Sequence, residues 1–187
     1  MRIFYISLIF LGFFGCLGTA FAQSAADPFK DGPGYAKVHV GSGFVCPAAI
    51  GAFERDAAGE YDVNTGADIC SYAALDGIYG TIILTPLTGA YDARTSLAPQ
   101  FVEEEGTGGK MIGEKTMRFG GLQVFTRSYR TAQAESLEYR KIFAGAQRGN
   151  WAVEAIVEYA DPRDAAQEKE FLDTVYAVAA KDVAQPQ

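Results

Sequence analysis

Tight-turn signals separate short apolar runs along most of this chain, and they restrict its fold more than any other feature. Asp76-Gly77 and Gly120-Gly121 suit the positive-φ positions of two-residue hairpin turns. Residues 57–59 and 148–150 are predicted three-residue loops, each with a glycine. Because turns this short join antiparallel strands, we predict an antiparallel sheet of about six or seven strands in hairpins.

The predicted loop at residues 57–59 also indicates which residues face each other. Extending the pairing outward from this loop places Cys46 directly opposite Cys70. Cysteines in that register are close enough for a disulfide, so we predict a Cys46–Cys70 bridge that stabilises the first hairpin. By the same reasoning, the loop at residues 148–150 places Arg140 opposite Glu158.

The last predicted strand has the clearest alternation in the chain. Its inner side is predicted to carry Trp151, Val153, Ala155, Val157 and Tyr159. Its outer side is predicted to carry Glu154, Ile156 and Glu158.

A first helix is predicted over residues 92–105. Asp92 is a suitable N-cap, and Leu97, Phe101 and Val102 form a narrow apolar stripe. Pro99 indicates either a kink or a second helix start.

A second helix is predicted over residues 161–181, with Asp161 as N-cap and Pro162 as its first residue. Its predicted buried stripe is Phe171, Leu172, Val175, Val178 and Ala179. The predicted class is α+β: a single domain over residues 36–181, with both helices packed on one face of the sheet. In the order of its elements alone, the chain is similar to the PsbP/Mog1-type α/β/α sandwiches, and that similarity carries over no functional residue.

The first 22 residues have the pattern of a signal peptide. A short basic start is followed by an apolar run and by Ala20-Phe21-Ala22, which fits a small-x-small cleavage site. We therefore expect cleavage near Ala22 and a periplasmic or secreted protein that has lost Cys16, with the leader as its only contact with the membrane. An uncleaved anchor and a lipidated Cys16 remain alternatives. Residues 23–35 are predicted to be a flexible arm, and residues 182–187 a frayed tail.

The chain is acidic, which excludes one class of partner. Its formal net charge is −7, and loss of Arg2 with the leader makes it −8. Such a surface repels nucleic acid, and no cluster of lysine and arginine offsets the repulsion.

Residues able to carry catalysis are few. His39 is the only histidine, and no serine lies in a Gly-x-Ser-x-Gly motif. We therefore expect His39 to be an exposed or a hydrogen-bonded strand residue. The predicted disulfide uses both remaining cysteines, which leaves too few ligands for zinc. We predict no catalytic residue, no metal ligand and no cofactor.

Two acidic groups keep alternatives open. Glu103-Glu104-Glu105 is the densest group of carboxylates, and paired carboxylates serve glycosidase-type hydrolysis. Three acids at a helix C-terminus also oppose the macrodipole, so we expect them to have a partner. The oxygen-rich run at residues 56–68 would allow a weak calcium site, although its spacing is not that of an EF-hand.

The leading prediction is a non-enzymatic exported domain that binds or assists another envelope protein or a small ligand. Phe125, Arg127 and Tyr129 share one side of a predicted strand, and they would form a partner-binding face if the helices leave that side bare. The alternatives are a carboxylate-based envelope hydrolase and a secreted enzyme inhibitor that presents a rigid loop.

Overall fold

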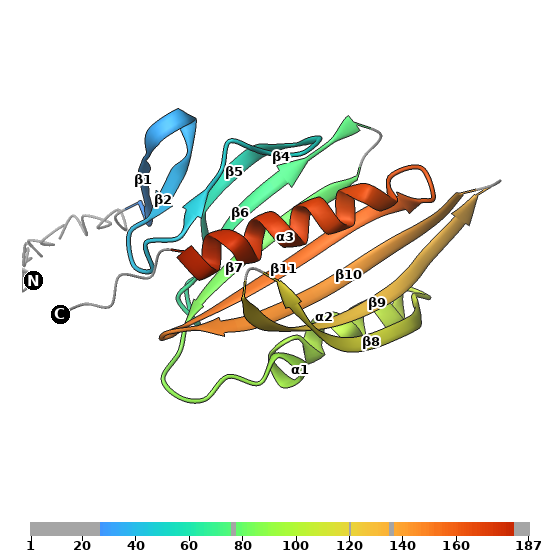
Figure 1. Cartoon of the computed structure of the whole chain (residues 1–187). Coiled ribbons are helices and arrows are strands. Elements are labelled where there is room, and N and C mark those ends of the chain that lie inside the picture. Colours follow the sequence, from blue (N-terminus) through green and yellow to red (C-terminus); the bar gives the residue numbers. More distant parts are fainter. Residues whose placement is uncertain (1–26, 76–77, 120, 135–136, 182–187) are drawn as a thin grey trace, which may run out of the picture.

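The described residues form two antiparallel sheets and three α-helices (Figure 1). The structure is a computed structural model that describes residues 27–75, 78–119, 121–134 and 137–181. The predicted leader, the Asp76-Gly77 turn, Gly120 and the predicted tail lie outside these ranges.

The main sheet has eight strands in the order β4-β5-β6-β7-β11-β10-β9-β8. Consecutive strands pair as hairpins from β4 to β7 and from β8 to β11, whereas β7 pairs with β11 and β8 lies at the far edge. The strands are β4 (Ala49–Ile50), β5 (Phe53–Asp62), β6 (Ala67–Ala73), β7 (Tyr79–Pro86), β8 (Lys110–Phe119), β9 (Leu122–Ala134), β10 (Leu137–Arg148) and β11 (Trp151–Asp161).

A small three-stranded sheet precedes the main one. It consists of β1 (Phe29–Asp31), β2 (Lys37–His39) and β3 (Val45–Cys46), with a short 3-10 helix, η1 (Pro33–Tyr35), between β1 and β2. Part of the predicted arm at residues 23–35 is therefore regular structure. Phe29 explains the difference, because it is buried and its ring lies 5.1 Å from that of His39.

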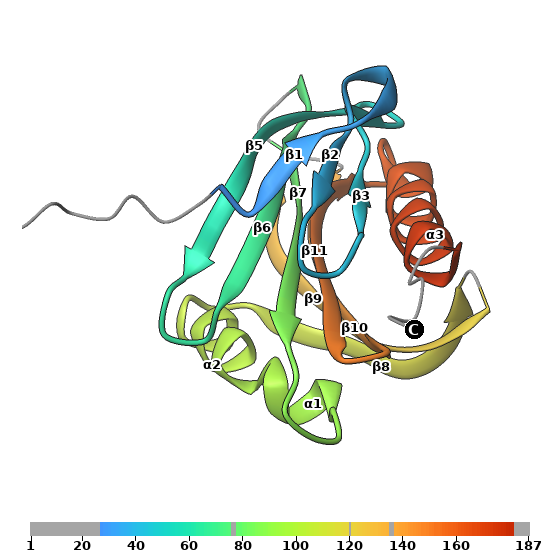
Figure 2. The same ribbon diagram turned by 90° about the vertical axis from the view of Figure 1, so that its left-hand side faces the viewer.

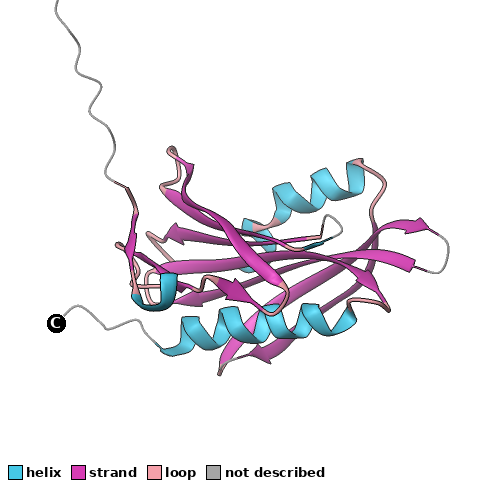
Figure 3. Ribbon diagram, turned by 90° about the horizontal axis from the view of Figure 1, so that it is seen from above, coloured by secondary structure: helices cyan, strands magenta, loops and turns pink. Residues whose placement is uncertain are grey.

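The helices lie on opposite faces of the main sheet (Figures 2 and 3). The long helix α3 (Ala165–Lys181) and the small sheet cover one face, called here the α3 face. The short helices α1 (Ala93–Ser96) and α2 (Ala98–Gly106) lie on the other, the α2 face. The prediction of two helices on one face is therefore wrong, and the predicted strand count of six or seven is too low.

The central strands explain why both faces are covered. On β11, Val153 and Val157 belong to one core cluster with Phe171 of α3. The intervening residue Ile156 points the opposite way and packs in a second cluster with Phe101 of α2. A strand with apolar side chains on both sides needs a covering element on each face. Glu154 and Glu158 suggested that one side of β11 faces solvent, so the sequence did not predict the helices that cover that side.

The first predicted hairpin loop is wrong. β5 runs through residues 57–59, and the chain turns instead at residues 63–66, where Gly66 has a φ of +68°. Glycine permits a positive φ but does not impose one, so Gly59 stays within the strand. As a result Cys70 lies opposite Ala58 rather than opposite Cys46.

The turn between β10 and β11 has two residues rather than three. Arg148 pairs with Trp151, and Gly149 has a φ of +57°. The shorter turn moves the register by one residue, so Glu158 faces Lys141 instead of Arg140.

The region of the first predicted helix divides at Leu97, so the reading of Pro99 as a second helix start is confirmed. Asp92 caps α1 by accepting a hydrogen bond of 3.2 Å from the Thr95 amide. Leu97 and Phe101 are buried as predicted, whereas Val102 is 71% exposed on the outer side of α2.

The last helix starts later than predicted. Asp161 is still the final residue of β11, where it pairs with Glu138 and binds Arg140 at 2.9 Å. It therefore does not cap α3, which begins at Ala165. Within α3 the buried residues include Tyr176, which the predicted stripe left out.

A contact between Gly80 of β7 and the ring of Phe171 predicts the effect of one methyl group. A Cβ at Gly80 would lie 2.3 Å from the ring, whereas a Cβ at Gly59 of β5 would meet nothing within 4 Å. We expect Gly80→Ala to lower the free energy of unfolding by about 1–3 kcal/mol, because an overfilled core displaces its neighbours. The matched Gly59→Ala should change it by less than about 0.5 kcal/mol. Urea denaturation of both variants measures this, and equal effects would contradict the packing described.

Candidate functional site

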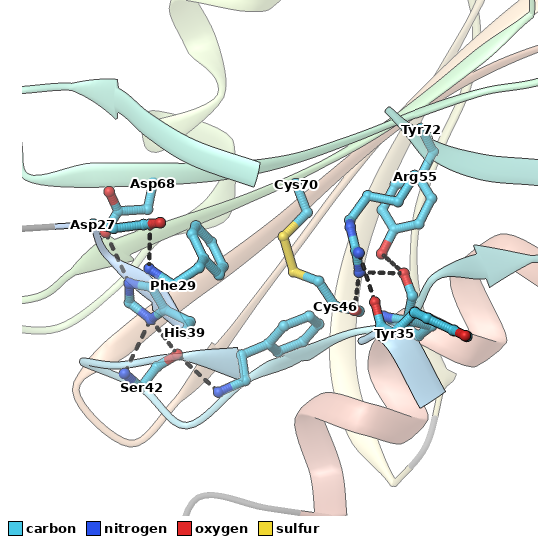
Figure 4. Close-up of a disulfide and its surroundings, with 12 residues drawn as sticks. Asp27, Phe29, Tyr35, His39, Ser42, Cys46, Arg55, Asp68, Cys70 and Tyr72 are labelled. Atoms are coloured by element: carbon cyan, nitrogen blue, oxygen red, sulfur yellow. Dashed lines mark hydrogen bonds and ion pairs between the residues drawn. A yellow bond between two sulfur atoms is a disulfide. The ribbon is translucent and has the colours of Figure 1, made fainter. Parts of the chain in front are cut away.

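The predicted disulfide is confirmed, but it links two sheets rather than one hairpin (Figure 4). Cys46 lies on β3 of the small sheet and Cys70 on β6 of the main sheet, with 6.4 Å between their Cα atoms. Both side chains are fully buried. The bridge therefore fixes the small sheet against the α3 face.

Arg55 on β5 adds a second tie between the sheets. Its Nη1 atom donates to the carbonyl oxygen of Cys46 at 2.7 Å, and its Nη2 atom donates to that of Tyr35 at 2.7 Å (Figure 4). Arg55 thereby joins β5 to both β3 and η1, and it pairs the part-buried carbonyl oxygen of Cys46.

A chain of hydrogen bonds through His39 makes a third tie (Figure 4). The Ser42 amide donates to His39 Nδ1 at 3.0 Å, so Nδ1 is assigned as an acceptor and Nε2 carries the proton. Nε2 then donates to Asp68 on β6 at 2.8 Å. The Ser42 hydroxyl donates to Nδ1 at 2.7 Å and accepts from the Phe44 amide at 3.1 Å.

This order of serine, histidine and aspartate resembles the connectivity of a nucleophilic triad, but its surroundings suit a structural role. The imidazole is buried between Phe29 and Trp151, whose ring centroid lies 4.8 Å away. The cavity beside Ser42 has a volume of about 10 Å³, room for about one water molecule. Of the two expectations for His39, the structure contains the hydrogen-bonded strand residue.

Three ties thus join the two sheets: the Cys46–Cys70 disulfide, the hydrogen bonds of Arg55 and the hydrogen-bond chain through His39. We call them together the intersheet clasp.

Glu104 supplies the partner contact that the acidic helix end was expected to need. Glu104 is buried at the end of α2 and accepts from Lys141 Nζ of β10 at 2.9 Å. Glu158 of β11 lies 3.2 Å from the same ammonium. Burial lowers the pKa of Lys141, but hydrogen bonds to Glu104 and Tyr79 outweigh this and leave the pKa raised. Of the other two helix acids, Glu105 accepts from Tyr129 at 2.8 Å.

The side of β9 that carries Phe125, Arg127 and Tyr129 is not bare. Tyr129 is completely buried, and the guanidinium of Arg127 lies 4.0 Å above the ring of Phe101 in α2. Arg127 also binds Glu114 of β8 at 2.7 Å. The sequence predicts a partner-binding face only if the helices leave this side of β9 bare, and α2 covers it. A role of these three residues in binding a partner stays a prediction.

Glu154 is a buried carboxyl group that the sequence pattern misplaced. It was predicted on an outward side, yet α1 covers it, and it accepts from the Tyr91 hydroxyl at 2.8 Å. Burial raises its pKa, and hydrogen bonds from Ser96 and Tyr91 offset this only in part. The signal that could have placed it was Ile156, which showed that this side of β11 is not purely polar.

The acidic run at residues 56–68 does not gather into one site. Asp62 accepts from the Asn64 amide at 2.9 Å within the turn, whereas Asp68 belongs to the clasp. Across the described ranges, no three histidine, cysteine, aspartate or glutamate side chains are placed to hold one metal ion.

The α2 face is open beyond the helices. Strand pairing puts Thr81 in one row with Ile156. Ile156 packs under α2, whereas Thr81 is only partly buried and lies beyond that cluster. The row continues to β5, where a Cβ on neighbouring Gly59 would meet nothing within 4 Å. We call the uncovered part the open shelf, formed by Ala57, Gly59, Ile69, Ser71, Ala73, Tyr79 and Thr81.

No protein-family model matches this chain, and no curated protein matches it. Among solved structures, it is similar to the solution structure of cyanobacterial PsbP (CyanoP) from Synechocystis sp. PCC 6803. The TM-score is 0.47 and the identity 14%, over 88% of this chain and 98% of that chain. Among the described residues, no helix has the length and apolar character needed to cross a membrane.

Removal of the disulfide should weaken the fold measurably. The bridge closes a loop with a sequence separation of 24. We expect Cys46→Ala/Cys70→Ala to lose about 3 kcal/mol of unfolding free energy, because the unfolded chain regains the entropy of that loop. Cys16→Ala is the matched control and should change nothing, since the predicted leader carries Cys16 away. Denaturant titration under non-reducing conditions measures the unfolding free energy of both variants. An unchanged value for the double variant would contradict a stabilising role of the disulfide.

Glu154 predicts a specific dependence of stability on pH. Because its pKa is raised in the folded state, the folded protein binds the proton more tightly than the unfolded chain. The stability that this tighter proton binding contributes is fully present below the pKa of the unfolded chain, about 4.3. It is lost as the pH rises through the higher pKa of Glu154 in the folded state. We therefore expect Glu154→Gln to raise the melting temperature at pH 8 relative to the parent, and to change it little at pH 4. A Gln variant that is less stable at pH 8 than the parent would contradict this.

Proposed function

We propose that this chain is an exported, non-catalytic binding domain and that a partner protein docks on the open shelf. The observation that carries the proposal is the unequal cover of the main sheet. The α3 face is closed by a helix, a small sheet and a disulfide, whereas the α2 face is closed only over part of its width.

The side chains of the open shelf suit a protein interface. Ala57, Gly59 and Ala73 are small, so the backbone of a partner can approach the sheet closely. Tyr79 is exposed, and tyrosine is enriched among residues that dominate binding energy. Lys141 and Glu158 border Tyr79 and supply a polar rim around this centre.

Export rests on the predicted leader over residues 1–22. A buried disulfide supports it, because disulfides persist in oxidising compartments such as the periplasm and are rare in the cytosol. As part of the clasp, the disulfide holds the small sheet on the α3 face, and the α2 face stays free to contact a partner.

Site-specific photo-crosslinking in the exporting cell tests the proposal. A photoreactive residue at Ala57 or at Ser71 should capture the same partner, whereas one at Ala166, an exposed alanine on α3, should capture none. Tyr79→Ala should weaken binding of the purified partner about tenfold or more, since hot-spot truncations cost about 2 kcal/mol. Its melting temperature should fall only slightly, because Tyr79 is already partly in solvent and Lys141 keeps Glu104 and Glu158 as partners. Equal capture at Ala57 and Ala166, or no effect of Tyr79→Ala, would reject the shelf as the binding surface.

A further inference from the structure

Among the described strands, the outer edge of β8 is unpaired and lies apart from the open shelf. β8 is the last strand of the main sheet, at the end opposite β4 and β5 (Figure 1). It has ten residues, and its outer edge pairs with no strand in the part of the chain that the structure describes. An edge of this length presents a row of main-chain donors and acceptors to solvent.

One hydrogen bond shows which main-chain groups face outward. The Thr126 hydroxyl of β9 donates to the carbonyl oxygen of Lys115 at 3.1 Å, so that carbonyl points toward β9. Main-chain groups alternate in direction along a strand. The amides and carbonyls of Glu114 and Thr116 therefore point to the open edge.

The edge is regular enough to pair with another strand. Its one irregularity lies between Met111 and Gly113, and pairing with β9 is continuous from Gly113 to Phe119. Met111 is 55% exposed and Ile112 44% exposed, so apolar contact area is available beside the backbone. A Cβ at Gly113 would meet nothing within 4 Å.

The charge of this edge is opposite to that of the whole chain. Lys110, Lys115 and Arg118 are exposed, and within the described ranges none of the three forms an ion pair. The one acid of β8, Glu114, is already paired with Arg94 and Arg127. A basic edge on a protein of net charge −7 selects for an acidic partner.

We propose that β8 binds an extended acidic segment of another exported protein as an added strand. Main-chain hydrogen bonds to Glu114 and Thr116 would supply affinity, and pairing with Lys115 and Arg118 would supply selectivity. This surface does not depend on the open shelf, because the two lie toward opposite edges of the sheet. Lysine on an edge strand also prevents edge-to-edge aggregation, and the experiment separates that role from binding.

The test uses a fluorescent eight-residue peptide of alternating glutamate and valine as the probe, with anisotropy as the readout on the purified exported protein. We expect saturable binding that a lysine–valine peptide does not reproduce. The charge reversal Lys115→Glu/Arg118→Glu should weaken binding at least tenfold.

A matched pair at Thr116 separates strand addition from simple charge attraction. Thr116→Pro removes the outward amide and is expected to weaken binding at least tenfold, whereas Thr116→Val keeps that amide and should stay within about twofold of the parent. A probe with alternate amides N-methylated removes the same hydrogen bonds without any change in the protein, so a folding defect in Thr116→Pro would not obscure the result.

Three outcomes would overturn the proposal. The first is equal binding of the methylated and unmethylated probes, which would indicate charge attraction alone. The second is no saturation by the acidic probe at millimolar concentration, which would leave the lysines with a protective role only. The third is self-association that Lys115→Glu abolishes while the probe still fails to bind, which would make a second copy of this chain the occupant.

Discussion

Burial of β11 on both faces is the constraint on which the rest of the structure depends. Val153 and Val157 need a cover on one side, and Ile156 needs one on the other. α3 meets the first need, and Gly80 lets the ring of Phe171 approach the sheet. α1 and α2 meet the second. The same side of the sheet also encloses Glu104, which pairs with Lys141, and Glu154, which accepts a hydrogen bond from the Tyr91 hydroxyl.

The two covers differ in extent, and this difference gives the molecule its free surfaces. The small sheet and the clasp extend the cover of the α3 face out to β6. Nothing among the described residues does the same for the α2 face, so the open shelf remains beside α2. The basic edge of β8 lies at the other end of the same sheet. The open shelf and the β8 edge are the two surfaces to which we assign contacts with other proteins in our proposals.

Short-range sequence signals predicted part of this arrangement. The strands, the first helix cap at Asp92 and the second start at Pro99 follow from local propensity, and the structure contains them. The Cys46–Cys70 bridge was predicted correctly from a register that is wrong, since Gly59 is not at a turn. The part of the argument that does not depend on the register is the expected loss of Cys16 with the predicted leader, which would leave two cysteines to pair. The partners of Glu104 and Glu154 were not predictable, because both lie on elements distant in the chain.

The sequence by itself determined an antiparallel α+β chain with one disulfide, because hairpin turns, helix caps and cysteine number act over a few residues or through composition. Only the tertiary structure decided that the helices lie on opposite faces, that Phe125, Arg127 and Tyr129 are covered, and that His39 joins two sheets. These outcomes depend on which apolar surfaces meet across long stretches of chain. The period of a strand pattern identifies its two sides but does not say which element covers each of them.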